Sequence, residues 1–325
     1  MDPVPIKNGE IRALPLAYES MGVRGMATYV ETDDVKILID PGSALGQRFR
    51  LEPHEREYVA LSRSRKTIET FARKSDLLTI SHYHYDHYVP DFEDWRYNWS
   101  SAELAERLYA GKIILAKDTS ENINKSQQKR GSDFAKNTIA IAEEIRMADG
   151  QTLKYGETSL KFSKPEYHGP EGTMLGYVIS LTVQTPNACL VHAPDVQGPM
   201  YSSSLRKLLK QDPDVLFIGG PPTYLRFKLA SGDLAAAQDN LKTLAERVPQ
   251  LIVDHHLLRD AKYTDFLKPV REIAAKARKK VTTASEFSGG EPKILEAKRR
   301  ELHAKEPVKK EWYERLERGE FKEGL

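Results

Sequence analysis

Three histidines and one aspartate fall within six consecutive positions, in the segment His82–His87, which reads HYHYDH. Histidine is a neutral nitrogen ligand near neutral pH and aspartate is a hard oxygen ligand, so this mixture favours zinc, with iron or manganese as alternatives, over calcium or magnesium. In an extended segment His82 and His84 lie on one side of the backbone, whereas Asp86 and His87 can reach a second position nearby. The spacing therefore favours two metal ions.

The residues alone leave a second interpretation open. The segment could be a solvated, histidine-rich turn whose aspartate caps a helix. The interleaved Tyr83, Tyr85 and Tyr88 are predicted to pack around the site. A metal site is the interpretation that explains the density of ligands.

The segment matches the signature His-x-His-x-Asp-His, and by it the chain resembles the metallo-β-lactamase fold superfamily. The resemblance implies further ligands that arrive one at a time, each after a later strand. His168, after the strand-like residues 159–163, would complete the first metal's set with His82 and His84. Asp195, after the apolar residues 189–194, would bridge both ions. Without the resemblance, His168 would be assigned to a surface loop and Asp195 to a turn.

The last ligand is ambiguous, because the apolar strand Leu251–Val253 leads into Asp254, His255 and His256. Adjacent residues of a strand face opposite ways, so only one of the two histidines is expected at the metals. The strand resembles the strand-Thr-His pattern of phosphodiesterase members, which favours His255 as the ligand beside Asp86 and His87. His256 is the alternative ligand, or faces the substrate, and Asp254 is expected to orient a ligand imidazole.

Two further residues are predicted to support the site. Asp40 closes the strand Val35–Ile39 and resembles the early aspartate of the superfamily, which holds the metal loop without binding metal. For His192 two roles are open: similar support of the ligands, or a buried histidine of the core.

This inventory predicts a dinuclear, metal-dependent hydrolase with two Zn²⁺, or Mn²⁺ or Fe²⁺ in their place. Two such ions lower the pKa of a shared water and so provide a bridging hydroxide near neutral pH. Among the ligands, Asp86 is also assigned a catalytic role. The charges of two ions, two carboxylates and one hydroxide leave a net positive site, which favours a small anionic or polarised ester such as a phosphoester, lactone or thioester.

Two alternatives belong to other classes. A nuclease or phosphodiesterase on RNA or DNA would need a basic groove. A mononuclear iron oxygenase or a non-catalytic metal-binding module would use only part of the ligand set. Flavin-linked diiron members of the superfamily have Glu where His84 stands, and the chain departs from them.

Composition bounds these hypotheses. The 325 residues carry 49 Lys and Arg against 47 Asp and Glu, so net charge does not indicate nucleic acid as a partner. Cys189 is the only cysteine, which excludes an intramolecular disulfide and thiolate-rich metal sites. No secretory leader or long apolar segment is apparent, so we expect a cytoplasmic protein without a membrane partner. The oligomeric state is not predicted.

Strands are predicted at 26–31, 35–40, 77–80, 113–116, 175–183, 188–192, 215–218, 251–254 and 281–284, and helices within 53–74, 101–110, 202–210, 234–247 and 267–279. Residues 138–147 are predicted to be a further helical or mixed segment. The resemblance implies an α/β fold, a four-layer αββα sandwich of two mixed sheets with helices outside. Residues 1–290 would form the catalytic domain, with a candidate cap insertion at 92–137, and residues 291–325 a charged helical tail docked on it.

Two loops have both a functional and an ordinary interpretation. The polar residues 122–131 either supply Lys125, Lys129 or Arg130 to an anionic substrate or form an exposed helix start. The turn 219–224, with two glycines and two prolines before Tyr224, either lines the substrate pocket or is a tight loop.

Overall fold

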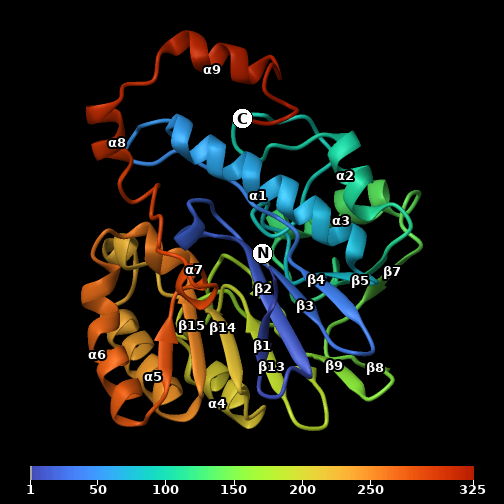
Figure 1. Cartoon of the computed structure of the whole chain (residues 1–325), viewed down its shortest axis with the longest axis vertical. Helices are drawn as coiled ribbons and strands as arrows, with labels where there is room; N and C mark the ends of the chain where they lie inside the picture. The colour runs from blue at the N-terminus through green and yellow to red at the C-terminus, as the bar shows by residue number, and fades with distance from the viewer. Residues whose placement is uncertain (1) are drawn as a thin grey trace.

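The computed structural model describes residues 2–325, which form two seven-stranded β-sheets packed face to face with helices on both outer surfaces (Figure 1). The first sheet is antiparallel from its first to its fourth strand and parallel from there on. In spatial order its strands are β1 (Val4–Ile6), β2 (Ile11–Tyr18), β3 (Met26–Glu31), β4 (Lys36–Ile39), β5 (Leu77–Ile80), β6 (Ile113–Ala116) and β7 (Glu144–Met147).

The second sheet is also mixed, with four parallel strands followed by three antiparallel ones. In spatial order these are β16 (Lys280–Thr282), β15 (Gln250–Asp254), β14 (Val215–Gly219), β13 (Cys189–Ala193), β12 (Leu181–Gln184), β9 (Thr158–Phe162) and β8 (Thr152–Tyr155). A separate pair is formed by β10 (Glu166–Tyr167) and β11 (Tyr177–Val178).

Strands buried on both faces explain the apolar runs in the sequence. In β14, Val215 and Phe217 lie in the core between the two sheets, and Leu216 and Ile218 lie in the core beneath the helices. This alternation follows from the two-residue period of a strand. Strands such as β5, β13 and β14, which are buried on both faces, therefore read as continuous hydrophobic stretches.

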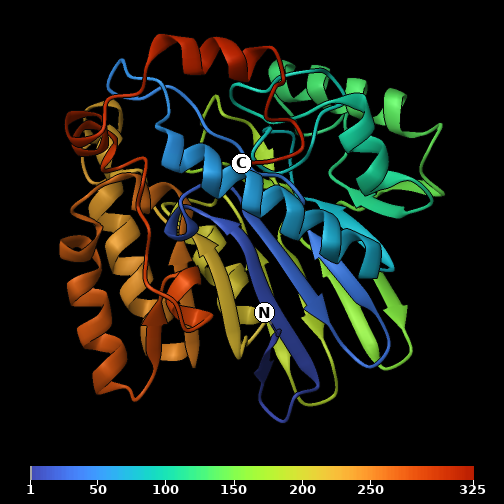
Figure 2. The ribbon, with the colours of Figure 1, turned by 45° about the horizontal axis from the view of Figure 1, so that its top comes forward.

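Helices form the two outer layers. The first sheet is covered by α1 (Glu55–Lys74), α2 (Ala102–Tyr109) and α3 (Lys125–Thr138), and the second by α4 (Ser202–Lys210), α5 (Asp233–Arg247) and α6 (Tyr263–Lys276). The long helix α1 crosses the first sheet (Figure 2). It begins at a capping box in which His54 accepts a backbone N–H and Glu57 bonds back to the His54 N–H. The short helices are η1 (Glu19–Met21), η2 (Thr223–Lys228), η3 (His255–Arg259) and α7 (Ala284–Phe287).

This arrangement confirms the predicted four-layer α/β sandwich. Two segments differ from their predictions. The strand predicted at 175–183 is divided between β11 and β12, which belong to different sheets. Residues 144–147, within the segment predicted to be helical or mixed, form the edge strand β7. Their pairing with β6 is a tertiary contact, and the local apolar spacing does not report it.

Residues 92–137, the candidate cap insertion, contain β6 and α2, which belong to the sheet and its helical layer. Helix α3 also packs on this layer, through Phe134. The Asn124 side chain donates to the Met174 carbonyl (2.8 Å), and Gln127 donates to the Leu175 carbonyl (2.7 Å) and accepts from the Tyr83 N–H (3.3 Å). The start of α3 thus joins the metal-loop segment to residues 174–175.

The C-terminal residues 291–325 include α8 (Arg299–Lys305) and α9 (Lys310–Glu317), which run along the outside of α1 (Figure 1). Leu316 is fully buried in the hydrophobic core that includes the residues of α1, and the rings of Trp312 and Tyr58 lie 5.0 Å apart. Arg299 is buried and donates to both carboxylate oxygens of Glu57, at 2.7 and 2.8 Å. Apolar contacts and a buried ion pair therefore attach this segment.

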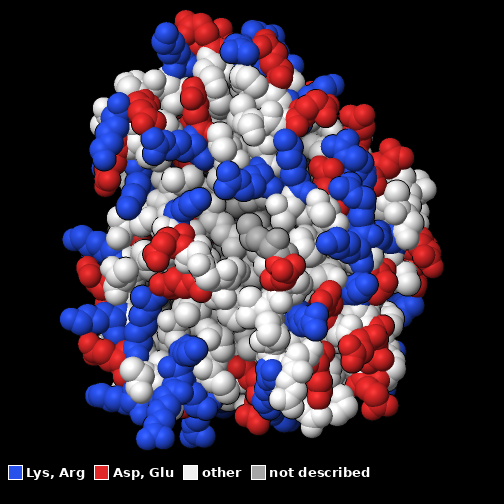
Figure 3. Space-filling model, viewed as in Figure 1, with Lys and Arg blue, Asp and Glu red and all other residues white. Residues whose placement is uncertain are grey.

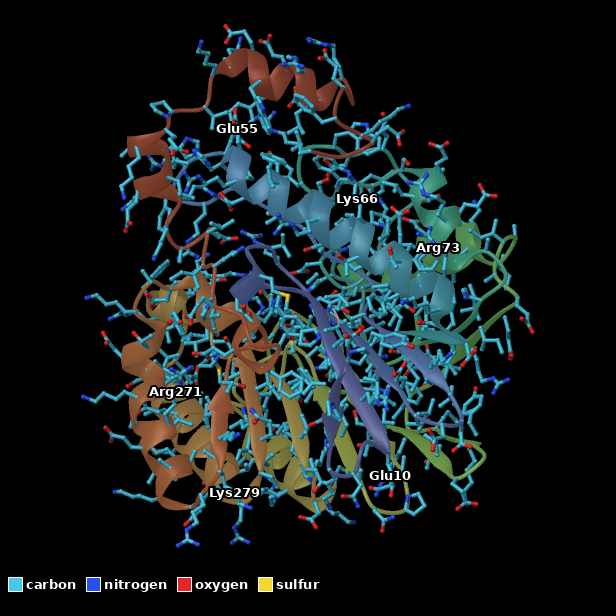
Figure 4. All side chains as sticks on the ribbon, viewed as in Figure 1. Glu10, Glu55, Lys66, Arg73, Arg271 and Lys279 are labelled. Carbon is cyan, nitrogen blue, oxygen red and sulfur yellow. The ribbon has the colours of Figure 1, made fainter. Side chains whose placement is uncertain are left out.

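Charges of both signs are interspersed over the face seen in Figure 3. Of the side chains labelled in Figure 4, Lys66 and Arg73 on α1 are exposed, and Arg271 on α6 is half-buried beside Glu286. Among residues 2–325 there is no helix long and apolar enough to span a bilayer.

Candidate metal centre

The predicted ligands come from loops at one edge of the sandwich. The signature segment follows β5, His168 follows β10, Asp195 follows β13 by two residues, and His255 follows β15 directly. Because parallel strands end at the same edge of a sheet, residues far apart in sequence meet there. Asp195 lies at the centre of the resulting cluster and is 1% exposed.

The first group of ligand atoms surrounds one oxygen of Asp195. His82 Nε2 lies 3.1 Å, His168 Nε2 2.8 Å and His84 Nδ1 4.0 Å from Asp195 Oδ2. These four side chains could hold one metal ion. Three nitrogen donors and one oxygen donor form a set typical of zinc.

The second group contacts both oxygens of Asp195. His255 Nε2 is 2.9 Å from Asp195 Oδ1 and 3.7 Å from Asp86 Oδ2, and His87 Nε2 is 3.4 Å from Asp195 Oδ2. Asp86, His87 and His255 could hold a second ion. Asp195 therefore contacts both groups, which also meet where the rings of His82 and His87 lie 4.2 Å apart.

Unpaired polar atoms support a metal at this position. Nε2 of His87, of His168 and of His255 and Oδ1 of Asp195 are buried and have no hydrogen-bond partner within residues 2–325. A buried polar atom without a partner costs about 1–3 kcal/mol. Coordination of cations by these atoms would offset that cost, so the donor set fits divalent metal.

His255 and His256 do not face opposite ways, contrary to the sequence prediction. His255 begins the 3₁₀ helix η3 and has a positive φ of 61°, so the two-residue alternation of a strand ends at Asp254. The Nε2 of His256 points to the same centre and lies 3.5 Å from Asp195 Oδ1. Both histidines therefore reach the cluster, with His255 the nearer.

Asp40 holds the signature segment from behind. It accepts hydrogen bonds from the Ser81 N–H (2.8 Å) and the Ser81 hydroxyl (2.6 Å), and its Oδ2 lies 2.8 Å from Nδ1 of His87. A carboxylate on Nδ1 fixes the ring and leaves Nε2 facing the centre. Ser81 Oγ also lies 3.0 Å from Nδ1 of His82.

Glu19, in η1, has the corresponding role for His255. Its Oε2 lies 2.7 Å from Nδ1 of His255, and its Oε1 accepts a hydrogen bond from Arg259 (2.6 Å). Burial opposes a proton on His255, but Glu19 and Asp195 together raise the pKa of His255 to about 9 in the metal-free protein. Arg259 also donates to Asp86 (3.3 Å) and so connects the second group to Glu19.

Glu19, Arg259 and Ser81 were not among the residues predicted from the sequence. Glu19 lies 236 residues from His255, and no local pattern marks it. Arg259 could have been found from the sequence, because it is a cationic residue only four positions after the predicted ligand His255. Ser81 directly precedes the signature and is a hydroxyl donor.

Asp254 and His192 have structural contacts. The prediction that Asp254 orients a ligand ring is wrong, because its carboxylate accepts the backbone N–H groups of Ser20, His255 and Ala284 at 2.7–3.1 Å. It therefore anchors the start of η3. His192 is buried with Nε2 3.0 Å from the Met26 carbonyl, which is the core role left open above.

Tyr224 lies at the cluster, as one of the two interpretations of its turn requires. Its hydroxyl is 3.5 Å from Nδ1 of His256 and 3.4 Å from the Arg259 guanidinium. The preceding glycines allow this approach: a Cβ at Gly219 would lie 2.8 Å from the Asp195 nitrogen, and one at Gly220 would lie 2.6 Å from Leu257 Cβ. The turn is thus packed directly against the centre.

Three residues of the site adopt positive φ angles: Asp40 (47°), Asp195 (38°) and His255 (61°). Such conformations cost about 1–3 kcal/mol for a non-glycine residue, and they cluster at functional sites. Each of these residues lies within two positions of the end of a strand. The chain turns there, and the turn directs the side chain into the site.

The protonation states of several ligands suit metal binding. Burial lowers the pKa of His84 to about 4 and holds the pKa of His82 well below its usual range. Burial alone would raise the pKa of Asp86, but nearby positive charge, above all on His87, holds it well below its ordinary value. Neutral imidazoles and ionised carboxylates are the forms that coordinate metal.

The centre is open on one side. The side chains of His84, Asp86 and His256 are 22%, 16% and 14% exposed, whereas those of His82 and His255 are fully buried. A substrate would reach the cluster past the three exposed residues. Lys125 and Lys129 have no ion pair among residues 2–325, and Arg130 lies 5.1 Å from the Tyr85 ring.

The fold and this cluster define a class of protein. A family model described as "Beta-lactamase superfamily domain" matches residues 24–229, and the chain belongs to that superfamily of metal-dependent hydrolases.

Within it the chain belongs to the UPF0282 group of archaeal proteins. A UPF0282 protein from Methanopyrus kandleri is 45% identical over 298 residues, covering 91% of this chain and 100% of the relative. One from Pyrococcus horikoshii is 40% identical, with 90% of this chain and 93% of the relative covered. A solved metal-dependent hydrolase of the β-lactamase superfamily is 12% identical with a TM-score of 0.46, covering 80% of this chain and 92% of its own.

Proposed function

We propose that the protein is a dinuclear metal-dependent hydrolase of anionic esters, with a phosphoester as the preferred substrate class. The observation that carries this proposal is the position of Asp195 between two groups of ligand atoms, one of three histidines and one of Asp86, His87 and His255. A single iron site for oxidation chemistry would need only one of the groups. The second group therefore favours hydrolysis.

His82, His84 and His168 would hold one ion, Asp86, His87 and His255 the other, and Asp195 both. Two Zn²⁺ ions bound there would lower the pKa of a shared water and polarise the scissile group. Zinc suits the nitrogen-rich donors, and Mn²⁺ or Fe²⁺ would suit the carboxylates.

The chain's own groups would orient the substrate on the open side. The Tyr224 hydroxyl and the Arg259 guanidinium are 3.4 Å apart and lie beside His256 and Asp86, two of the exposed residues. Both can donate hydrogen bonds to an oxyanion. Buried donors of this kind stabilise negative charge more strongly than water does.

Metal analysis together with an ester panel tests the proposal. We expect about two zinc ions per chain and hydrolysis of bis(p-nitrophenyl) phosphate that a chelator abolishes and zinc restores. A lactone and a thioester belong in the same panel, because the same centre could hydrolyse them. One iron per chain and no hydrolysis of any ester would overturn the proposal.

A nuclease or phosphodiesterase is the second candidate. The near-neutral net charge of the chain gives this candidate no general support. Arg48, which stacks on Tyr224, and Arg300, which stacks on Phe49, give it local support.

A further inference from the structure

Cationic and aromatic side chains alternate in contact from the metal centre to the C-terminal tail. Tyr224 touches His256, and the guanidinium carbon of Arg48 lies 4.0 Å from the Tyr224 ring centroid. The same carbon lies 4.7 Å from the ring of Phe49, and the guanidinium carbon of Arg300 lies 4.4 Å from it. We call Tyr224, Arg48, Phe49 and Arg300 the arginine ladder.

The guanidinium groups of the ladder have free donors. A guanidinium that stacks on a ring is held in place while its N–H edge stays available to an anion. Arg48 Nε is buried without a hydrogen-bond partner, and Arg48 Nη1 forms a long ion pair with Glu296 at 3.6 Å. Glu296 already accepts two hydrogen bonds from Arg24, at 2.6 and 3.0 Å. Arg300 is exposed and makes no ion pair within residues 2–325.

The turn that carries Arg48 is held in a costly conformation. Phe49 and Arg50 have φ angles of 58° and 60°, and the backbones of Arg48 and Leu51 bond to each other at 2.9 and 3.2 Å. Two successive non-glycine residues in the left-handed region are uncommon, and such strain often marks a ligand site. Arg299 of the tail donates to the Leu51 carbonyl (3.2 Å) and so holds the turn.

The ladder begins on the open side of the centre. His256 is one of the three partly exposed residues there, and Tyr224 lies against it. Along the ladder the exposed fraction of the arginine side chains increases. It is 13% for Arg48, and Arg300 lies at the surface. A substrate whose ester lies over the metals could extend along this path.

We propose that the arginine ladder binds a second phosphate group of the substrate, next to the one at the metal centre. The inference rests on the proposed function and deepens it. It selects a substrate with successive phosphates, such as a nucleotide bisphosphate or a short single strand, over a neutral lactone or thioester. The C-terminal tail then contributes Arg300 to the substrate site, and the buried Arg299 holds the turn that carries Arg48.

Binding of two matched nucleotides tests the ladder without any turnover. We expect the zinc-loaded protein to bind thymidine 3′,5′-bisphosphate at least about tenfold more tightly than thymidine 5′-phosphate, since a charge-assisted hydrogen bond contributes that much. Arg48→Met and Arg300→Met should each bring this ratio towards one. Arg73→Met, which removes an exposed arginine of α1, should leave the ratio unchanged (Figure 4). Calorimetry measures affinity per folded site, so partial unfolding of a variant does not change the ratio.

Equal affinities in the unchanged protein, or a preference that survives both ladder substitutions, would overturn the inference. Hydrolysis of the p-nitrophenyl ester of thymidine 5′-phosphate, assayed in parallel, tests the proposed function separately. Absence of hydrolysis with a retained affinity ratio would contradict the function and support the ladder. Comparison of the bisphosphate with a short oligothymidylate then distinguishes a small nucleotide from a nucleic acid strand.

Discussion

The Oε2 atom of Glu19 lies 2.7 Å from Nδ1 of His255, although the two residues are 236 positions apart. This contact turns the His255 Nε2 towards Asp195. It also places a carboxylate from the N-terminal part of the chain directly behind a ligand contributed by the last third. The second metal group therefore depends on the packing of η1 against η3.

Replacement of Glu19 should weaken metal binding. We expect Glu19→Gln to lower the affinity for the second ion by about 10- to 100-fold, because the amide fixes the ring less firmly and supports its charge less. Competition with a chromogenic chelator measures the effect. Glu103→Gln, at an exposed position of α2, serves as the control. Equal affinities of the two variants would show that Glu19 does not support the site.

Substitution of ligands should abolish turnover. We expect Asp86→Ala and His84→Ala to remove hydrolysis of activated phosphodiesters while circular dichroism stays unchanged, because both side chains are partly exposed and their loss leaves the core intact. Asp239→Ala, on the surface of α5, should retain full activity. Unchanged turnover in either ligand variant would refute the assigned metal centre.

Metal removal should lower thermal stability. Ligand binding to the native state alone contributes about 4 kcal/mol when the free metal is a thousandfold above its dissociation constant. For a chain of this size that corresponds to a fall in Tm of roughly 6 °C after chelation. Differential scanning calorimetry with chelator and with added zinc gives the comparison, and coincident transitions would argue against a specific site.

The buried pair between Arg299 and Glu57 should be important for stability. Both side chains are fully buried, so Arg299→Ala leaves an uncompensated carboxylate and should cost about 3–5 kcal/mol. Arg315→Ala, which breaks the exposed pair with Glu320, should cost about 1 kcal/mol or less. Guanidinium denaturation measures both. Equal losses would mean that the tail is not anchored through this pair.

The single cysteine should be unreactive in the folded protein. Burial raises the pKa of the Cys189 thiol to about 12, so the thiolate is scarce at pH 8 and increases only as pH approaches that value. We expect a thiol-disulfide reagent to react slowly at pH 8 and rapidly once guanidinium unfolds the chain. Fast labelling of the native protein at pH 8 would contradict the burial of this strand.

Several elements could be read directly from the sequence. The apolar runs of β5, β13 and β14 mark strands buried on both faces, and the spacing of Tyr58, Leu61, Ile68 and Phe71 marks the buried face of α1. The edge strand β7 could not be found in this way, since its spacing mimics a helix and only pairing with β6 decides its conformation. The period of apolar residues in a sequence reports which face of an element is buried. The edge strand β7 is only partly buried, so its sequence carries little of this period.

The sequence by itself determined the chemistry of the site, because ligand type and spacing in His82–His87 are local properties of the chain. The tertiary structure decided which groups support and surround these ligands. Glu19 and Arg259 meet His255 and Asp86 through the tertiary packing, and the tail brings Arg300 to Phe49. The direction of His256 was likewise decided by the start of η3 and not by strand alternation. Such contacts join residues that no short pattern relates, so the packing of the two sheets is the step that creates them.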